Sequence, residues 1–266
     1  MKNIRIMTIS TLREAMSKKV FIVFIAISLV VLIIQILVFS LFKTNTLAPG
    51  MSLAEGISRL EIMMISSLAG LCLLLSIFSC SSFIPSMLEK GNIDLLLSKP
   101  VSRTELLLGK YFGGLLVVFI NILFLILGVW LIVGLKFGFW NIAFLYSSLI
   151  ITFTFAVLYS LIVLLGIMTQ GSMSGMMAAY FIYIVLSPLL HFAKFKGANF
   201  IENETLKTII DWFYYIIPKT QELMNDTLVS LTTKNYIENY QPLATSFAFL
   251  LVMLIFSVLI FRKKDF

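Results

Sequence analysis

The sequence is poor in charged residues. Only 12% of its 266 residues are charged, whereas 60% are hydrophobic and 24 are phenylalanine. A soluble domain ordinarily has about 25% charged residues. This shortage excludes a water-soluble globular protein and favours one whose surface faces lipid. The net charge of +7 does not indicate nucleic-acid binding, because the basic residues flank apolar runs and form no patch of their own.

Side chains that carry catalysis or bind metals are also scarce. The chain has one histidine, His191, and two cysteines, Cys72 and Cys80, which lie within one apolar stretch. We interpret the cysteines as small apolar packing residues and His191 as a polar residue at the end of a membrane span. No nucleophile is paired with a base, so we expect no catalytic residue, no metal site and no cofactor.

Long uncharged runs are abundant by contrast. About 20 helical residues cross the roughly 30 Å of hydrocarbon in a bilayer, and six runs have about this length without Lys, Arg, Asp or Glu in their interior. They are residues 20–42, 62–83, 111–135, 139–167, 173–192 and 243–261. Strands of a barrel would be shorter and would alternate in polarity. The sequence therefore predicts an all-α membrane protein with six transmembrane helices.

The basic residues predict its orientation. Six spans place both termini on one side of the membrane, and the segments on that side contain 12 of the 20 basic residues. Since short basic segments remain in the cytoplasm, we expect cytoplasmic N- and C-termini. The predicted location is the bacterial cytoplasmic membrane, which the chain crosses several times.

The predicted segments outside the spans include an external region at residues 193–242. Within it, residues 206–217 are apolar and aromatic, are too short to cross a membrane and precede Pro218. We interpret them as a re-entrant or interfacial helix in contact with membrane lipid. Packing against the ends of the spans is the alternative.

The cytoplasmic loop at residues 84–110 is predicted to form two short helices. Pro100 disfavours helix in the residue before it, so the first helix is expected to end near Ser98. Ser102 and Glu105 have the spacing of a capping box, which starts the second helix. That helix continues into the third span through Gly109 and Gly113, whose spacing lets helices approach closely. The first helix could lie on lipid or bind a cytoplasmic partner, and its periodicity does not distinguish the two.

The loop also carries a family resemblance. The segments are Glu89-Lys90-Gly91, Asp94-Leu95-Leu96-Leu97-Ser98-Lys99-Pro100-Val101-Ser102-Arg103 and Glu105-Leu106-Leu107-Leu108-Gly109-Lys110. This pattern resembles the intracellular coupling segment of ABC type-2 permeases, the membrane subunits of ATP-driven exporters. It is particularly similar to the branch that includes the permease of the nitrous-oxide reductase maturation system. The six spans and the external region between the fifth and sixth also fit that family.

The resemblance implies a domain organisation and partners. Residues 1–19 would form a cytoplasmic connecting helix, although they could also be only a basic orientation signal, and residues 20–266 would form the six-helix transmembrane domain. Two copies, or one copy and a homologous permease, would form a dimer in which each contacts a separate cytoplasmic ABC ATPase subunit. The residues implied in that contact are Glu89, Lys90, Gly91, Asp94, Leu97, Pro100, Arg103 and Glu105.

The chain has no Gly-x-x-x-x-Gly-Lys-Ser/Thr loop, so ATP hydrolysis is expected on the partner subunit and not on this chain. A secondary transporter is one alternative, but such proteins place ionisable residues inside their spans, and these runs have no acidic or basic ones. A non-transporting membrane assembly factor is the other alternative. The sequence does not indicate the cargo.

Overall fold

The computed structural model describes residues 2–17, 19–41, 53–89, 91, 101–195, 204–234 and 236–264. Within these ranges all regular secondary structure is helical, which confirms the all-α character that the sequence predicts. The long helices are α2 (Lys19–Leu41), α3 (Leu53–Cys80), α6 (Arg103–Phe137), α7 (Ala143–Thr169) and α13 (Gln241–Lys263).

The fifth predicted span is a continuous helix in three parts. They are α8 (Ser172–Tyr180), the π-helical segment η2 (Phe181–Leu186) and α9 (Ser187–Phe195). Five described helical stretches, this one included, are long and apolar enough to cross a membrane, and α2 adds a shorter apolar helix at Ile22–Leu37. All six predicted spans thus coincide with apolar helices.

Two helices extend well beyond the predicted spans. α6 begins at Arg103 and not at residue 111, and its 35 residues correspond to a length of about 52 Å. α3 begins at Leu53 and includes Glu61, which lies outside the predicted run. The predicted limits were set by the nearest charged residue, whereas a helix continues for as long as its backbone is hydrogen-bonded. Both helices exceed the roughly 30 Å that a bilayer requires.

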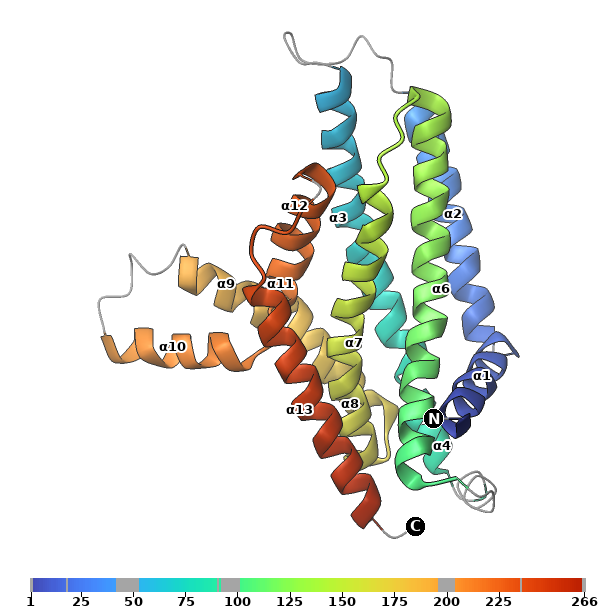
Figure 1. The fold of residues 1–266 in the computed structure, drawn as a ribbon, viewed down its shortest axis with the longest axis vertical. Helices are drawn as coiled ribbons and strands as arrows, with labels where there is room; N and C mark the ends of the chain where they lie inside the picture. The colour runs from blue at the N-terminus through green and yellow to red at the C-terminus, as the bar shows by residue number, and fades with distance from the viewer. Residues whose placement is uncertain are drawn as a thin grey trace.

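The helices form an elongated bundle with α7 at its centre (Figure 1). α7 is the most buried of the long helices and packs against α6, α8, α12 and α13. Both termini lie at one end of the bundle, which we call the terminal end, and we call the opposite end the far end. The shared core is apolar, and its fully buried side chains include Ile65, Leu73, Ile77, Ile122, Ile126, Phe155 and Val163.

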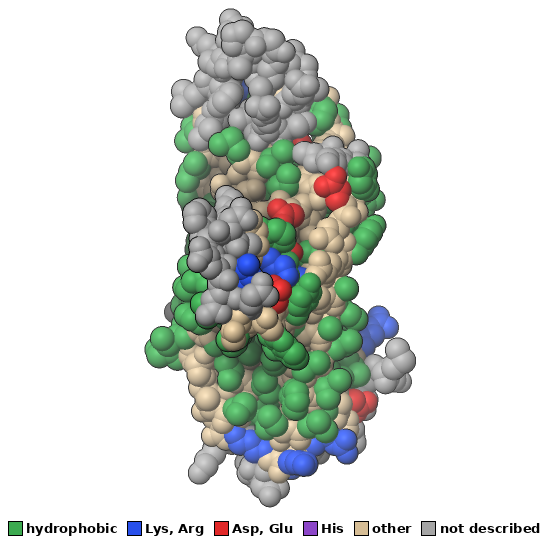
Figure 2. Space-filling model, turned by 90° about the vertical axis from the view of Figure 1, so that its left-hand side faces the viewer, with side chains coloured by type: hydrophobic (Ala, Val, Ile, Leu, Met, Phe, Trp, Pro, Cys, Tyr) green, Lys and Arg blue, Asp and Glu red, His purple; other side chains and the backbone are tan. Residues whose placement is uncertain are grey.

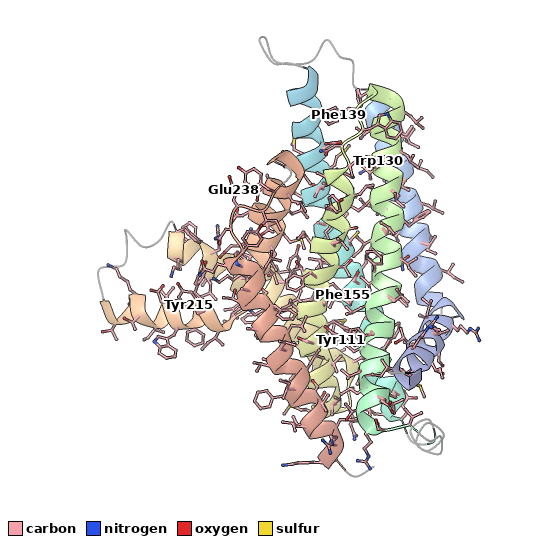
Figure 3. The ribbon with its side chains drawn as sticks, viewed as in Figure 1. Tyr111, Trp130, Phe139, Phe155, Tyr215 and Glu238 are labelled. Atoms are coloured by element: carbon pink, nitrogen blue, oxygen red, sulfur yellow. The ribbon has the colours of Figure 1, made fainter. Side chains whose placement is uncertain are left out.

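Aromatic rings join α6 and α7 inside this core (Figure 3). Tyr111 of α6 stacks on Tyr159 of α7 with ring centroids 5.3 Å apart, and Tyr159 stacks on Phe155 at 5.2 Å. The Tyr111 hydroxyl donates to the carbonyl of Ala156 at 2.9 Å. These contacts fix α6 and α7 to each other near the middle of the bundle.

The shorter helices lie around the bundle. They are α1 (Lys2–Ser17), α4 (Phe83–Leu88), α10 (Glu204–Ile216), α11 (Thr220–Glu222), the π-helical η3 (Leu223–Thr227) and α12 (Leu228–Lys234). α10 coincides with the predicted helix at residues 206–217 and lies across the long axis of the bundle (Figure 1). η3 and α12 pack on α7, whereas α11 packs on α9 and α13.

Candidate coupling site at the terminal end

α6 begins with the predicted capping box. The backbone amide of Glu105 donates to the Ser102 hydroxyl at 3.2 Å, and the Ser102 amide donates to the Glu105 carboxylate at 3.1 Å. Each side chain therefore satisfies an amide that the first helical turn leaves without a partner. The carboxylate also stands at the positive end of the helix dipole. The start of α6 is therefore well defined, and it lies within residues 89–110, the segment that resembles a coupling segment.

Four of the eight residues predicted to contact the ATPase are among those that the structure describes. Glu89 and Gly91 are exposed after α4, whereas Arg103 and Glu105 are partly buried in the first turn of α6. Gly91 has a φ of 89°, a left-handed conformation that favours glycine. Four predicted residues, Lys90, Asp94, Leu97 and Pro100, lie outside the described residues, as does the predicted helix that ends near Ser98.

α4 holds the entry to this loop against the bundle. Its side chains Phe83, Ile84, Met87 and Leu88 are buried. The ring of Pro85 lies next to Gly166 of α7, 3.5 Å from the position that a Cβ would occupy there. The loop that follows α4 therefore starts from a fixed point, at the exposed residue Glu89.

Arg103 has an internal partner that the sequence did not reveal. Its guanidinium donates to the backbone carbonyl of Lys264 at 2.6 Å, just after α13. The Lys264 ammonium in turn donates to the carbonyl of Ile167 at 2.7 Å, in the last turn of α7. Cations at the C-terminal ends of helices satisfy free carbonyls and the helix dipole. Arg103 and Lys264 thereby tie the ends of α6, α7 and α13 together, and the basic tail after the last span was the signal for it.

α1 packs closely against the beginning of α6. A Cβ on Gly109 would lie 2.4 Å from the Cβ of Met7, and one on Gly113 would lie 2.4 Å from the Cβ of Thr11. The predicted close approach at these glycines is thus confirmed, and α1 is the helix that approaches. α1 buries Met7, Thr11 and Ala15 on this side.

An ion pair strengthens the same contact. The Lys110 ammonium bonds to the Glu14 carboxylate, and the Lys110 side chain is only 9% exposed whereas that of Glu14 is 40% exposed. The small residues, the ion pair and the buried face of α1 make α1 and the first turns of α6 one rigid unit. A displacement at the start of α6 would therefore also move α1.

A second polar cluster lies where α9, α10 and α11 meet. The Tyr214 hydroxyl donates to the buried Glu222 carboxylate at 2.7 Å, and Nδ1 of His191 lies 3.7 Å from the same carboxylate. The ammonium of Lys219 is buried and lies 4.0 Å from the centre of the Tyr214 ring. Burial lowers the pKa of Lys219, whereas burial and then the bond to Glu222 raise the pKa of Tyr214. His191 thus lies beside a buried carboxylate, without a hydrogen bond to it.

No group of three His, Cys, Asp or Glu side chains could hold a metal ion in the part of the chain that the structure describes. Cys72 and Cys80 are both buried with free thiols. As predicted, they pack as small apolar residues and form no disulfide.

Comparison with known proteins assigns the family. A family model described as "ABC-2 family transporter protein" matches residues 10–266, which is nearly the whole chain. No curated protein matches the sequence. The six apolar helices, the capped start of α6 and this match agree with the resemblance seen in the loop. The chain belongs to the ABC-2 transporter family and is a multi-pass membrane protein of the kind that typically serves as a non-catalytic membrane subunit.

Proposed function

We propose that the chain is the permease subunit of an ATP-driven exporter. In this proposal it forms the translocation path together with a second copy or a homologous permease. A separate cytoplasmic ATPase subunit binds the loop between α4 and α6. The sequence of that loop further suggests kinship with the branch that includes the permease of the nitrous-oxide reductase maturation system.

The observation that carries the proposal is the way α6 begins. Its first turn is fixed by the capping box, and in the sequence it follows the loop that starts at Glu89. From there a single helix of 35 residues runs to the far end of the bundle. A push on this loop would therefore reach the opposite side of the membrane through one rigid element.

The contacts around α6 explain how a displacement of the loop would be transmitted to the other helices. Arg103 binds the end of α13, Lys110 binds Glu14 of α1, and Tyr111 stacks on Tyr159 of α7. Closure of two ATPase subunits on ATP would move the loops of two permeases, and these contacts would shift the helices as units. Because rigid packed helices move as bodies, the cargo path between the two permeases would change shape.

Charge reversal in the loop tests the ATPase contact. We expect Glu89→Lys combined with Asp94→Lys to abolish recovery of the ATPase subunit with the purified chain, while membrane insertion stays intact. Glu238→Lys, a reversal of an exposed charge toward the far end, is the matched control and should leave recovery unchanged (Figure 3). Equal recovery of the ATPase with the loop variant and with wild type would contradict the proposed contact.

A second experiment separates the proposal from a secondary transporter. The purified chain, placed alone in liposomes, should move no solute when an ion gradient is applied. Uptake or release driven by that gradient would contradict an ATP-driven mechanism.

A further inference from the structure

The ammonium of Lys219 is a buried charge without a hydrogen bond. Lys219 is 3% exposed, and its Nζ atom has no hydrogen-bond partner among the described residues. It lies 4.0 Å and 4.9 Å from the ring centres of Tyr214 and Tyr215, whose faces attract a cation. The adjacent Thr220 hydroxyl is also buried and also lacks a partner in the described part of the chain. A buried charge of this kind destabilises the fold unless a hydrogen-bonding group joins it.

The nearby carboxylates are bonded to other groups. Glu222 accepts a bond of 2.7 Å from the Tyr214 hydroxyl, and Asp211 pairs with Lys194 at 2.8 Å. Neither carboxylate bonds to the Lys219 ammonium. Lys219 can therefore donate hydrogen bonds to a ligand.

Ser187 of α9 is a second donor beside Lys219. Its hydroxyl oxygen accepts from the Gln221 amide at 3.0 Å, whereas its hydrogen is donated to no group in the residues that the structure describes. Both residues line a small cavity between α9, α10 and α11, and the complete lining is Ser187, Leu190, Tyr214, Ile217, Pro218, Lys219 and Glu222. The cavity volume is about 10 Å³, which is room for about one water molecule. An ammonium and a hydroxyl thus line a space the size of one oxygen atom.

The cavity lies at membrane depth. Ser187 is 15 residues beyond Ser172, where the fifth span begins, and this corresponds to about 22 Å along a helix. Ser246 of α13, which accepts the Lys219 amide at 3.2 Å, is 17 residues from Lys263 at the terminal end, or about 26 Å. Both lengths are shorter than the roughly 30 Å of hydrocarbon in a bilayer.

Exposed apolar side chains extend to both sides of this level. Leu131 and Leu135 follow Trp130 on α6 and are exposed toward the far end, and Phe247 and Leu251 are exposed on α13 toward the terminal end (Figure 3). Figure 2 shows charged side chains at mid-height, with mainly hydrophobic side chains between them and the Lys and Arg residues of the terminal end. Ionisable residues at membrane depth are rare and usually mark a pathway or a ligand site.

We propose that this cavity binds the carboxylate of an amphiphile that has an alkyl chain. A carboxylate oxygen accepts bonds from both an ammonium and a hydroxyl, and its bond to an ammonium is a strong one. The slim end of such a molecule fits a space of one oxygen atom, whereas the phosphate of a phospholipid carries a substituent on each side. Leu190, Ile217 and Pro218 in the lining suit the methylene groups that follow the carboxylate.

The role of this site in transport rests on the proposed function. In an exporter, an amphiphilic carboxylate is the expected class of cargo, and it would occupy the cavity on its way to the outer leaflet. Binding itself requires no ATPase and is measured on the chain alone. Failure to bind a carboxylate would therefore leave the ATPase contact intact, and loss of that contact would leave binding unchanged.

Photolabelling of the wild-type chain tests the position of the site. The full-length chain in phosphatidylcholine nanodiscs is exposed to a fatty acid with a photoreactive diazirine near its carboxylate, and labelled peptides are identified by mass spectrometry. We expect labels within residues 187–195 and 210–222, displaced by decanoate. Decanol has the same chain without the charge and should displace the label roughly tenfold less effectively.

Three variants test the charges that line the cavity. Lys219→Gln removes the ammonium and should weaken the affinity for decanoate roughly tenfold. Glu222→Gln should strengthen it, because a negative charge beside the ligand is lost while Tyr214 keeps an acceptor. Lys207→Gln, at an exposed position of α10, is the matched control and should leave it unchanged. Weaker binding in both the Lys219 and the Glu222 variant would show that these residues only hold the fold together, and would overturn the proposal.

Four other outcomes would also overturn it. They are labels confined to other segments, equal displacement by decanol, equal displacement by phosphatidylglycerol added to the nanodiscs, and an unchanged affinity of Lys219→Gln. The second would indicate binding of the alkyl chain alone, and the third would make a membrane phospholipid the occupant. The comparison of decanoate with decanol uses no variant, so it decides the question even if a variant fails to fold.

Discussion

The two halves of the bundle treat polar groups differently. At the terminal end the charged groups Arg103, Lys110 and Lys264 have close partners. Six described side-chain atoms are buried without a hydrogen-bond partner, and five of them belong to residues away from the terminal end: Gln35, Glu61, His191, Lys219 and Thr220. A buried polar group without a hydrogen-bond partner destabilises the fold, and any new partner would stabilise it. The far half therefore has interactions that can be exchanged. The terminal end is thus suited to transmit a displacement, and the far half to change its contacts in response.

The largest expected loss of stability is at the terminal end. Gly109→Ala would place a Cβ 2.4 Å from that of Met7, which cannot swing aside, so α1 must shift. Overpacking of this kind costs about 1 to 3 kcal/mol. We expect a lower midpoint of thermal unfolding and faster tryptic cleavage at Arg5 and Arg13. Gly171→Ala is the control, because its nearest neighbour would be 3.8 Å away. Equal effects of the two substitutions would contradict the close packing of α1 on α6.

A comparable but smaller loss of stability is expected in the far half. Tyr214→Phe removes the donor that serves the buried Glu222 carboxylate. Hydrogen bonds to charged groups contribute about 1.5 to 3 kcal/mol, and His191 lies close enough to replace part of this loss. The midpoint of unfolding should fall for Tyr214→Phe and stay unchanged for Tyr240→Phe, whose ring is exposed. An unchanged midpoint for both would show that the bond does not stabilise the protein.

The ion pair between Glu14 of α1 and Lys110 of α6 should contribute less to stability. Because the Glu14 side chain is 40% exposed, solvent screens its attraction to Lys110, and exposed pairs contribute about 0.2 to 1 kcal/mol. Glu14→Gln should lower the unfolding midpoint slightly, and adding Lys110→Met should restore it, since no buried ammonium then remains. The measurement is a comparison of the single and double variants at low and high salt. A double variant less stable than the single one would contradict the account.

The smallest predicted effect is a dependence of the unfolding midpoint on pH. Burial lowers the pKa of Lys219 in the folded protein, so in the alkaline range the unfolded chain binds more protons than the folded one. Stability from this group therefore rises as the pH increases from the lowered pKa toward the ordinary lysine value of about 10.4. Lys219→Met should remove this rise in the unfolding midpoint, and Lys207→Met, at an exposed position, should keep it. Identical pH profiles for Lys219→Met and wild type would contradict the prediction.

The sequence predicted the helices well because lipid imposes a simple rule on them. Runs without charge had to be helical, and Ser102 and Glu105 formed their capping box because it depends only on neighbouring residues. The glycines at 109 and 113 indicated close packing, although not that α1 is the partner. The internal partners of Arg103, Lys219 and Glu222 could not be predicted, since they depend on how other helices pack against these residues. The family match at residues 10–266 confirms the coarse identity, while the ATPase contact stays a prediction.

Isolation of the intact complex tests the central claim most directly. The chain, extracted in a mild detergent and analysed by mass spectrometry, should be recovered with a cytoplasmic ATPase that carries the nucleotide-binding loop missing here. The loss of that ATPase on reversal of Glu89 and Asp94 would place the contact in the loop between α4 and α6. Recovery of the chain without any ATPase under gentle conditions would contradict the account.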